Sequence, residues 1–178
     1  MHPDVERVIV TQEQIAERVQ SLADQITRDY AGKEPMFVGI LSGSFIFMAD
    51  LVRACDLPCT MDFMVASSYG SGTTSAGKIN LKKDLSHSAE GRDLILVEDI
   101  LDTGNTLYFL REYLQTKNPA SIRIATLLDK PERRTADIRA DYSGYTIPDA
   151  FVVGYGLDYD QKYRNLPYIG VLKPSVYS

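Results

Sequence analysis

The sequence predicts an α/β fold in which helices flank a central, mostly parallel β-sheet. Two observations predict it: short apolar runs of strand length, such as residues 37–41 and 94–97, recur along the chain, and stretches with helical spacing separate them. The chain has 178 residues, of which 44% are hydrophobic and 24% are charged. That length and composition are typical of one globular domain with a sizeable core, here residues 1–178.

The first predicted helix covers residues 11–30. Its start carries Thr11 and Gln14, a pair that can form a capping box. Its apolar side chains recur at intervals of three or four residues, which places them on one face of a helix. These side chains are Ile15, Val19, Leu22 and Ile26. The pattern therefore predicts an amphipathic helix with one face directed at the core.

Strands and helices continue to alternate through the rest of the chain. Strands are expected at residues 37–41, 60–69, 94–97, 121–128 and 151–157. Helices are expected at residues 45–53 and 103–116, the second of which Asn118-Pro119 would end. Residues 70–91 are polar and weakly alternating only at 78–81, and so long a loop in a compact domain is usually functional or disordered. Because such sheets bind ligands at the carboxyl ends of their strands, we expect a site formed by residues 42–44, 67–70, 98–106 and 129–130.

The formal net charge of −5 argues against a general nucleic-acid or membrane-surface binder, since either would show an excess of basic residues. The least polar uncharged stretch, residues 36–49, is interrupted by polar residues and is too short to span a membrane. If the protein handles a polyanion, it must do so locally and with the help of a metal ion.

The cysteines indicate the compartment. Cys55 and Cys59 form no CxxC motif, and the two histidines, His2 and His87, lie far from them in the sequence. A four-ligand zinc site is therefore poorly supported, and two free thiols are expected. Residues 1–11 contain no apolar segment long enough for a secretory signal, so the sequence predicts a reducing, cytoplasmic location.

The segment ILVEDILDTGNTL, residues 95–107, carries most of the chemistry. Glu98, Asp99 and Asp102 place three carboxylates within five residues, and these would repel one another without a divalent cation or a hydroxyl-rich ligand between them. The small or polar residues 103–106 follow at the start of a predicted helix, where free backbone N–H groups can hold a phosphate. The segment thus combines groups for a metal or a sugar with a seat for an anion.

Residues 97–107, VEDILDTGNTL, resemble the phosphoribosyl pyrophosphate (PRPP) motif of the type I phosphoribosyltransferases, and most of all the hypoxanthine-guanine branch. Other segments agree in order and spacing, so that the resemblance runs from about Val8 to the C-terminus. It implies the fold of that family, with a small hood over the carboxyl ends of the strands. The hood would come from the N-terminal residues and from roughly residues 145–178. The further matching segments are LSGS at 41–44, SSYG at 67–70, LLDK at 127–130, IPDAFVVGYGLDY at 147–159 and YRNL at 163–166.

The resemblance implies a reaction in which a 6-oxopurine attacks C1 of PRPP and releases pyrophosphate, with Mg²⁺ as cofactor. Asp102 would be the general base at purine N7. Glu98 and Asp99 would bind the ribose hydroxyls and belong to the metal shell, and Asp158 would be a further Mg²⁺ ligand through water. The 5′-phosphate would be held by Asp102, Thr103, Gly104, Asn105 and Thr106.

Pyrophosphate and purine would each have a binding segment of their own. Ser42, Gly43 and Arg164 would bind pyrophosphate, although many relatives carry a basic residue where this chain has Ser42; a cis peptide before this position is seen in the family. Lys130 would donate to purine O6 and Phe151 would stack on the base, with Val152 and Leu157 at its edge. Ser68 and Tyr69 would begin a lid that excludes water.

Three alternatives stay open at the level of sequence. Residues 72–78, GTTSAGK, match most of a Walker A motif, but Ile79 stands where a Mg²⁺-binding Ser or Thr is needed. A regulator of the same fold that senses PRPP or purine is a second alternative, which the acidic charge disfavours. A xanthine-preferring enzyme is the third. The resemblance also implies a homodimer or homotetramer, with small-molecule substrates and no nucleic-acid or membrane partner.

Overall fold

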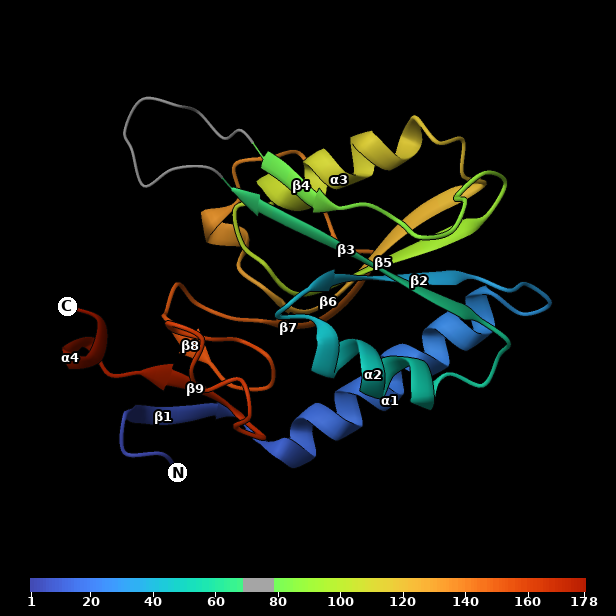
Figure 1. Cartoon of the computed structure of the whole chain (residues 1–178). Helices are drawn as coiled ribbons and strands as arrows, with labels where there is room; N and C mark the ends of the chain where they lie inside the picture. The colour runs from blue at the N-terminus through green and yellow to red at the C-terminus, as the bar shows by residue number, and fades with distance from the viewer. Residues whose placement is uncertain (69–78) are drawn as a thin grey trace.

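The computed structural model describes residues 1–68 and 79–178, which form a larger and a smaller β-sheet with helices packed on them (Figure 1). The larger sheet has the strand order β4-β3-β2-β5-β6-β7. Its strands are β2 (Met36–Leu41), β3 (Thr60–Ser68), β4 (Ile79–Lys83), β5 (Asp93–Leu101), β6 (Ser121–Asp129) and β7 (Tyr142–Thr146). The smaller sheet consists of β1 (Val5–Val10), β9 (Ile169–Leu172) and β8 (Val152–Val153), in that order.

The helices are α1 (Gln12–Asp29), α2 (Phe45–Ala54), α3 (Asn105–Gln115) and the short α4 (Pro174–Tyr177), with a 3-10 turn η1 (Pro131–Arg133). Thr11 caps α1, and the predicted capping box with Gln14 is confirmed, since each side chain binds the other residue's backbone N–H. No helix in the two described ranges is both long and apolar enough to cross a membrane.

The larger sheet is mostly parallel, as predicted. β3, β2, β5, β6 and β7 run in the same direction, and β4 pairs antiparallel with β3 at one edge. Successive side chains of a strand point to opposite faces. In β5, Leu94 and Leu96 contribute to the cluster around α3, whereas Ile95 and Val97 contribute to the cluster around α1 and α2. Helices therefore cover both faces, which requires the continuous apolar run seen in the sequence.

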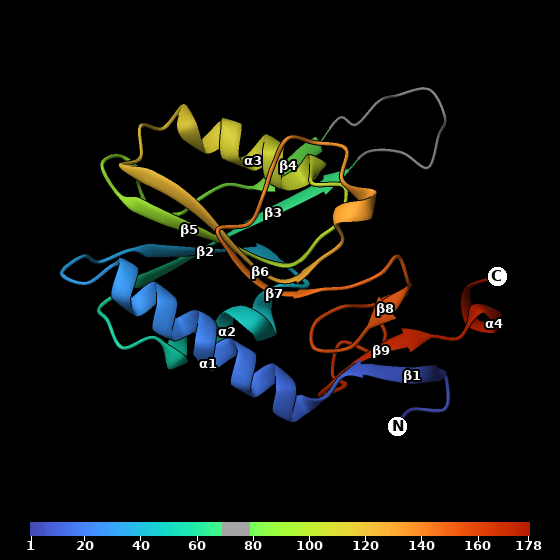
Figure 2. The same ribbon diagram turned by 180° about the vertical axis from the view of Figure 1, so that it is seen from behind.

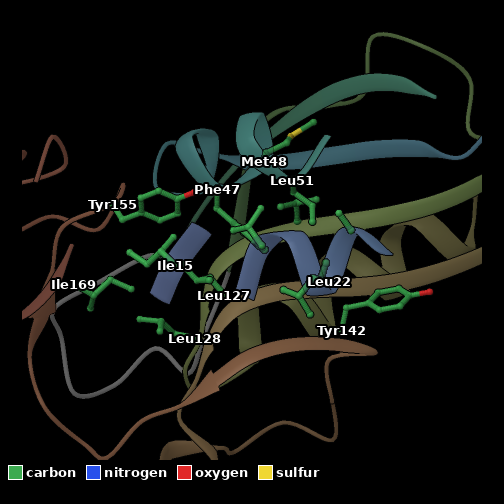
Figure 3. Packing of buried hydrophobic residues seen from close by; sticks show 14 of the residues in the cluster. Ile15, Leu22, Phe47, Met48, Leu51, Leu127, Leu128, Tyr142, Tyr155 and Ile169 are labelled. Carbon is green, nitrogen blue, oxygen red and sulfur yellow. The ribbon is translucent and has the colours of Figure 1, made fainter. Parts of the chain in front are cut away.

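The core between the sheet and helices α1 and α2 contains the apolar face predicted for residues 11–30 (Figure 3). Ile15 and Leu22 from α1 pack with Phe47 and Leu51 from α2, and all four side chains are buried. Burial of such side chains stabilises the fold by about 1.5–3 kcal/mol each. This layer fixes the position of β2 and β5, from whose carboxyl ends the site is built.

The smaller sheet lies beside the end of the larger sheet at which the parallel strands terminate, as both views show (Figures 1 and 2). We call β1, β8, β9 and α4 the hood. All of its pairings are antiparallel, and its apolar cluster contains Val5, Val153 and Leu172. The arrangement brings the two chain ends to the carboxyl edge of the larger sheet, where the resemblance places a hood.

Several predicted elements need correction. The strand expected at 151–157 is wrong beyond Val153, because Gly154, Tyr155 and Gly156 all adopt positive φ angles and turn the chain. The polar segment 70–91 is not a loop throughout, since it contains β4. The helix expected at 103–116 begins at Asn105. Strand β5 extends to Leu101, so Glu98 and Asp99 belong to the strand itself. Strands β1, β7 and β9 were not predicted.

Candidate active site

A cavity of about 580 Å³ opens between the carboxyl ends of β5 and β6 and the hood. The predicted residues Asp99, Asp102, Lys130, Phe151, Val152, Leu157 and Asp158 line it. They come from three segments that are far apart in the sequence, and the parallel sheet and the hood bring them together. A separate, mainly apolar hollow of about 410 Å³ lies between α1, α2 and the segment around Leu166, and no predicted site residue lines it.

The loop between β5 and α3 forms a smaller hollow of about 200 Å³, which we call the phosphate hollow. It shares Asp99, Ile100 and Asp102 with the 580 Å³ cavity. Glu98, Thr103, Gly104 and Thr106 also line it. Gly104 has a φ of 83°, and a Cβ there would meet the Ile138 side chain, so a glycine is required. None of the first-turn side chains of α3, all of which the structure describes, is acidic. The positive end of the helix dipole is therefore free for an anion.

Asn105, the first residue of α3, is exposed and does not line the hollow in this structure. Its side-chain oxygen accepts a hydrogen bond from Thr135 Oγ1 at 3.2 Å. Its backbone N–H lies 3.4 Å from Thr103 Oγ1. Asn105 therefore holds the loop through its contact with residue 135, and its predicted role at the phosphate would rest on its backbone.

Glu98 and Asp99 form a pair of adjacent, partly buried carboxyls in β5. Burial raises the pKa of Glu98 well above its ordinary value, and the neighbouring charge of Asp99 raises it further. Burial also raises the pKa of Asp99, while its hydrogen bonds and the charge of Arg164 act in the opposite direction. This pair thus carries an unfavourable electrostatic energy, which a cation or ribose hydroxyl donors would relieve.

Glu98→Gln is expected to stabilise the ligand-free protein. A carboxyl with a raised native pKa binds its proton more tightly in the folded than in the unfolded state, so the free energy of unfolding falls as pH rises above the ordinary carboxyl pKa. At about pH 8 we expect a Tm increase of roughly 2–4 °C, which corresponds to about 1 kcal/mol for a chain of this size. The increase should shrink towards about pH 4, where both states are protonated.

Thermal unfolding followed by circular dichroism at several pH values measures this effect. Glu90→Gln is the matched control, because Glu90 is exposed. A lower Tm for Glu98→Gln at the alkaline end, or a Tm difference that does not vary with pH, would contradict the electrostatic interpretation.

The predicted pyrophosphate loop, residues 42–44, packs directly against this carboxyl pair. A Cβ on Gly43 would overlap Asp99 Oδ2, and a Cβ on Gly156 would overlap the Gly43 carbonyl oxygen. Gly43 is therefore held between β5 and the turn that follows β8. The Leu41-Ser42 peptide is cis, as the family resemblance implies. Ser42 is exposed and does not line the main cavity.

Arg164 lies at the same rim although it does not line the cavity itself. Its Nη1 donates to the Gly156 carbonyl oxygen at 2.6 Å, and its Nη2 lies 3.1 Å from Asp158 Oδ1. Its charge also opposes the rise in the pKa of Asp99 that burial causes. Arg164 thus joins the turn at Gly156 to the acidic residues of the site and supplies a positive charge at the rim.

Lys130 follows the last residue of β6 and is only 7% exposed. Its backbone N–H donates to Leu101 O at 2.9 Å, which fixes it beside the end of β5. Its Nζ donates to the Ala150 carbonyl oxygen at 2.6 Å and lies 3.7 Å from Asp149 Oδ1. An ammonium group has three N–H donors, and the Ala150 carbonyl oxygen accepts from one of those of Lys130. The group can therefore also donate to a ligand oxygen in the cavity.

Two arginines that the sequence analysis did not assign complete the site. Arg133 Nε donates to Asp102 Oδ1 at 2.8 Å, and its Nη1 lies 3.5 Å from Asp149 Oδ2. Arg134 donates to the Asp102 carbonyl oxygen at 3.0 Å and also pairs with Asp129. The available signal was their position three and four residues after Lys130, close to the carboxyl end of a parallel strand, where ligands bind in such sheets.

Part of the predicted lid lies outside the described residues. Ser68 is the last residue of β3, whereas Tyr69 and the Walker-like segment 72–78 fall in the range that the structure does not describe. The lid assignment therefore stays a prediction.

Comparisons with known proteins identify the family. A family model described as "Phosphoribosyl transferase domain" matches residues 8–160, so the chain belongs to the phosphoribosyltransferase family. The hypoxanthine-guanine phosphoribosyltransferase of Streptococcus pneumoniae is 55% identical over 175 residues, which cover 98% of this chain and 97% of that protein. The hypoxanthine-guanine phosphoribosyltransferase of Bacillus subtilis is 51% identical, over 99% of this chain and 98% of that protein. A crystal structure of a Staphylococcus aureus hypoxanthine phosphoribosyltransferase superimposes with a TM-score of 0.96 at 53% identity. The match covers 100% of this chain and 97% of that chain.

Proposed function

We propose that the protein is a hypoxanthine-guanine phosphoribosyltransferase of purine salvage. It would transfer the phosphoribosyl group of PRPP to N9 of hypoxanthine or guanine and release pyrophosphate. The observation that carries the proposal is one cavity that contains Asp102, Lys130 and Phe151 and adjoins a phosphate seat at the start of α3. The relatives named for this activity, at about half identity over the full length, support the same substrates.

Asp102 would act as the general base. Its Oδ1 is held by Arg133 Nε, while the structure records no hydrogen bond to Oδ2 from the described residues. A carboxylate oriented through one oxygen can accept the N7 proton of the purine through the other. As this proton leaves, N9 becomes a better nucleophile towards C1 of PRPP.

Glu98 and Asp99 would serve the ribose. Bond breaking at C1 leaves positive charge on the sugar, and nearby carboxylates stabilise that charge. Burial raises the pKa values of both, so ligand hydroxyls that donate to them would offset the unfavourable energy of burial. The same pair thereby contributes to PRPP binding and to the transition state.

Lys130 would set the choice of base. Its ammonium can donate to a purine O6 but cannot accept from a 6-amino group. A site built around a hydrogen bond strongly rejects an analogue that cannot form it. We therefore expect hypoxanthine and guanine to be substrates and adenine to be excluded. Xanthine differs only at C2, and no described contact addresses that position.

Mg²⁺ fits the donor set. Asp99 and Asp158 line the same cavity, and carboxylate oxygens are the ligands that a hard cation prefers. No three acidic or histidine residues of the described ranges converge as a ready metal cluster. Protein groups would therefore supply few ligands, directly or through water, and substrate oxygens the rest. When bound, Mg²⁺ would neutralise the charge that develops on pyrophosphate.

Initial rates with PRPP, Mg²⁺ and each base in turn test the proposal. We expect turnover with hypoxanthine and guanine, none with adenine, and none when EDTA removes the metal. Turnover with xanthine alone would favour the xanthine-specific alternative. PRPP or purine binding without turnover of any base would favour a sensing regulator of the same fold.

We further propose that the whole chain forms one domain, acts in the cytoplasm and assembles as a homodimer or homotetramer. The two cysteines, both free and partly buried, support a reducing compartment. The resemblance to the family supports the assembly. Size-exclusion chromatography with light scattering measures the oligomeric state.

A further inference from the structure

Three aromatic rings gather at the hood side of the cavity. The Phe151 and Tyr177 rings are stacked, with centroids 4.9 Å apart and an interplanar angle of 22°. The Tyr159 ring lies nearly perpendicular to the Phe151 ring, with centroids 5.6 Å apart and an interplanar angle of 86°. Phe151 and Tyr177 both line the cavity and are exposed to nearly the same extent, 39% and 38%. Tyr177 is the penultimate residue of the chain, and the sequence pattern does not assign it to the site.

The Tyr177 ring has a rigid support. α4 follows β9 directly, and the Lys173 backbone N–H donates to Asp4 O at 2.9 Å. Val176 packs against the apolar cluster of the hood, and Leu172 N–H donates to the carbonyl oxygen of Phe151 itself at 2.9 Å. Backbone hydrogen bonds and packing therefore connect Tyr177 to the residue on which its ring stacks. The C-terminal turn is part of the hood and not a loose end.

This geometry restricts how Phe151 can meet a ligand. An aromatic ring has two faces, and the stacked Tyr177 ring covers one of them, while the Tyr159 ring packs nearly perpendicular to Phe151. A planar base that stacks on Phe151 without moving the C-terminus can use only the other face. The two tyrosines also limit rotation of the Phe151 side chain, which reduces the ordering that ligand binding would otherwise require.

We propose that Tyr177 is a positioning residue for the purine: its ring supports Phe151 from behind and presents the opposite face to the base. The inference rests on the proposed function, because it assigns the base to the Phe151 face. Aromatic pairs contribute enough beyond their buried area that loss of this one should weaken base binding about three- to tenfold. Tyr177 would act on the base alone, since it does not line the phosphate hollow.

Equilibrium binding of GMP and of ribose 5-phosphate by calorimetry tests the proposal without turnover. Ribose 5-phosphate has the sugar and phosphate of GMP but no base. For Tyr177→Ala we expect a three- to tenfold higher Kd for GMP and an unchanged Kd for ribose 5-phosphate. Tyr177→Phe keeps the ring and should restore wild-type GMP binding. Tyr108→Ala is the matched control, because Tyr108 is 39% exposed on α3 and lines neither the 580 Å³ cavity nor the phosphate hollow.

The outcomes separate this inference from the function on which it rests. If the wild-type protein binds GMP no better than ribose 5-phosphate, the purine site itself is wrong and both fail. If the wild type prefers GMP and Tyr177→Ala binds it equally well, the positioning role alone is overturned. Tighter GMP binding by Tyr177→Ala would also overturn it and would show that the tyrosine occupies the place of the base.

Discussion

Asp102→Asn is expected to lower kcat by about 10²–10⁴-fold, the range that general-base catalysis contributes. Asparagine has nearly the same shape and can remain near Arg133, but it cannot accept the N7 proton. The backbone of residue 102, which Arg134 braces through its carbonyl oxygen, should keep its place beside the phosphate seat. KM for PRPP should therefore change little. Steady-state kinetics with hypoxanthine as the fixed saturating substrate measure both constants.

Asp149→Asn is the matched control for this substitution. Asp149 lines the same cavity and contacts the same guanidinium, Arg133 Nη1, at 3.5 Å. The ion pairs of Arg133 with Asp102 and with Asp149 are both solvent-exposed, and exposed ion pairs contribute little to stability. We expect no more than about a tenfold loss of rate from Asp149→Asn, since Asp149 contributes only ion pairs, with Arg133 and with Lys130 Nζ at 3.7 Å, and has no proton to transfer in the proposed reaction. Comparable losses from both variants, or a loss in PRPP affinity that accounts for the whole effect of Asp102→Asn, would contradict the base assignment.

Gly43→Ala is expected to reduce kcat/KM for PRPP by about 10²-fold or more, because misplacement of site groups by about 1 Å has effects of this size. The added methyl would overlap Asp99 Oδ2, and the Gly43 carbonyl is already in contact with Gly156 on the other side. Neither neighbour can withdraw easily, since Asp99 lies within β5 and Gly156 sits in a tight turn with positive φ. The carboxyl that serves the ribose would have to move. Overpacking of this kind also costs about 1–3 kcal/mol of stability.

Gly32→Ala separates this local effect from a general cost of replacing glycine. Gly32 follows α1 at a φ of 76°, and a Cβ there meets nothing within 4 Å. Alanine at this position should lower Tm through backbone strain but leave kcat/KM unchanged. Wild-type kinetics for Gly43→Ala would show that the loop is free to move away from Asp99 and would contradict the packing described above.

The elements that could be predicted from the sequence are those whose pattern is local. A buried parallel strand needs a continuous apolar run, which residues 94–97 show, and an amphipathic helix needs the spacing found in α1. The acidic segment around Asp102 was equally visible, because its residues are adjacent in the chain. The resemblance to the family then supplied Lys130 and Phe151, which no local pattern distinguishes from a surface lysine and a core aromatic.

The elements that could not be predicted depend on long-range pairing. β1 and β9 lie at opposite ends of the chain, and each is a strand because it pairs with the other. The turn after β8 requires a positive φ at Tyr155, which a sequence rule does not anticipate for a tyrosine. Arg133 and Tyr177 become site residues only when η1 and the hood meet at the cavity.

The net charge of −5 is compatible with the proposed binding of an anionic substrate. The anion is to be held by backbone N–H groups at the start of α3, which add no formal charge, and by Arg164 at the rim. The acidic residues Glu98, Asp99 and Asp158 are those that we propose to serve the cation and the ribose. With such a site, an acidic protein would bind a polyanionic substrate without a basic surface.

Phosphorus NMR of the wild-type protein with PRPP, Mg²⁺ and hypoxanthine tests the central claim most directly. The account predicts that the PRPP signals disappear while free pyrophosphate and a nucleotide 5′-monophosphate appear in equal amounts. The same conversion should occur with guanine in place of hypoxanthine but not with adenine. Stable PRPP signals with every 6-oxopurine, under conditions in which the folded protein binds PRPP, would contradict it.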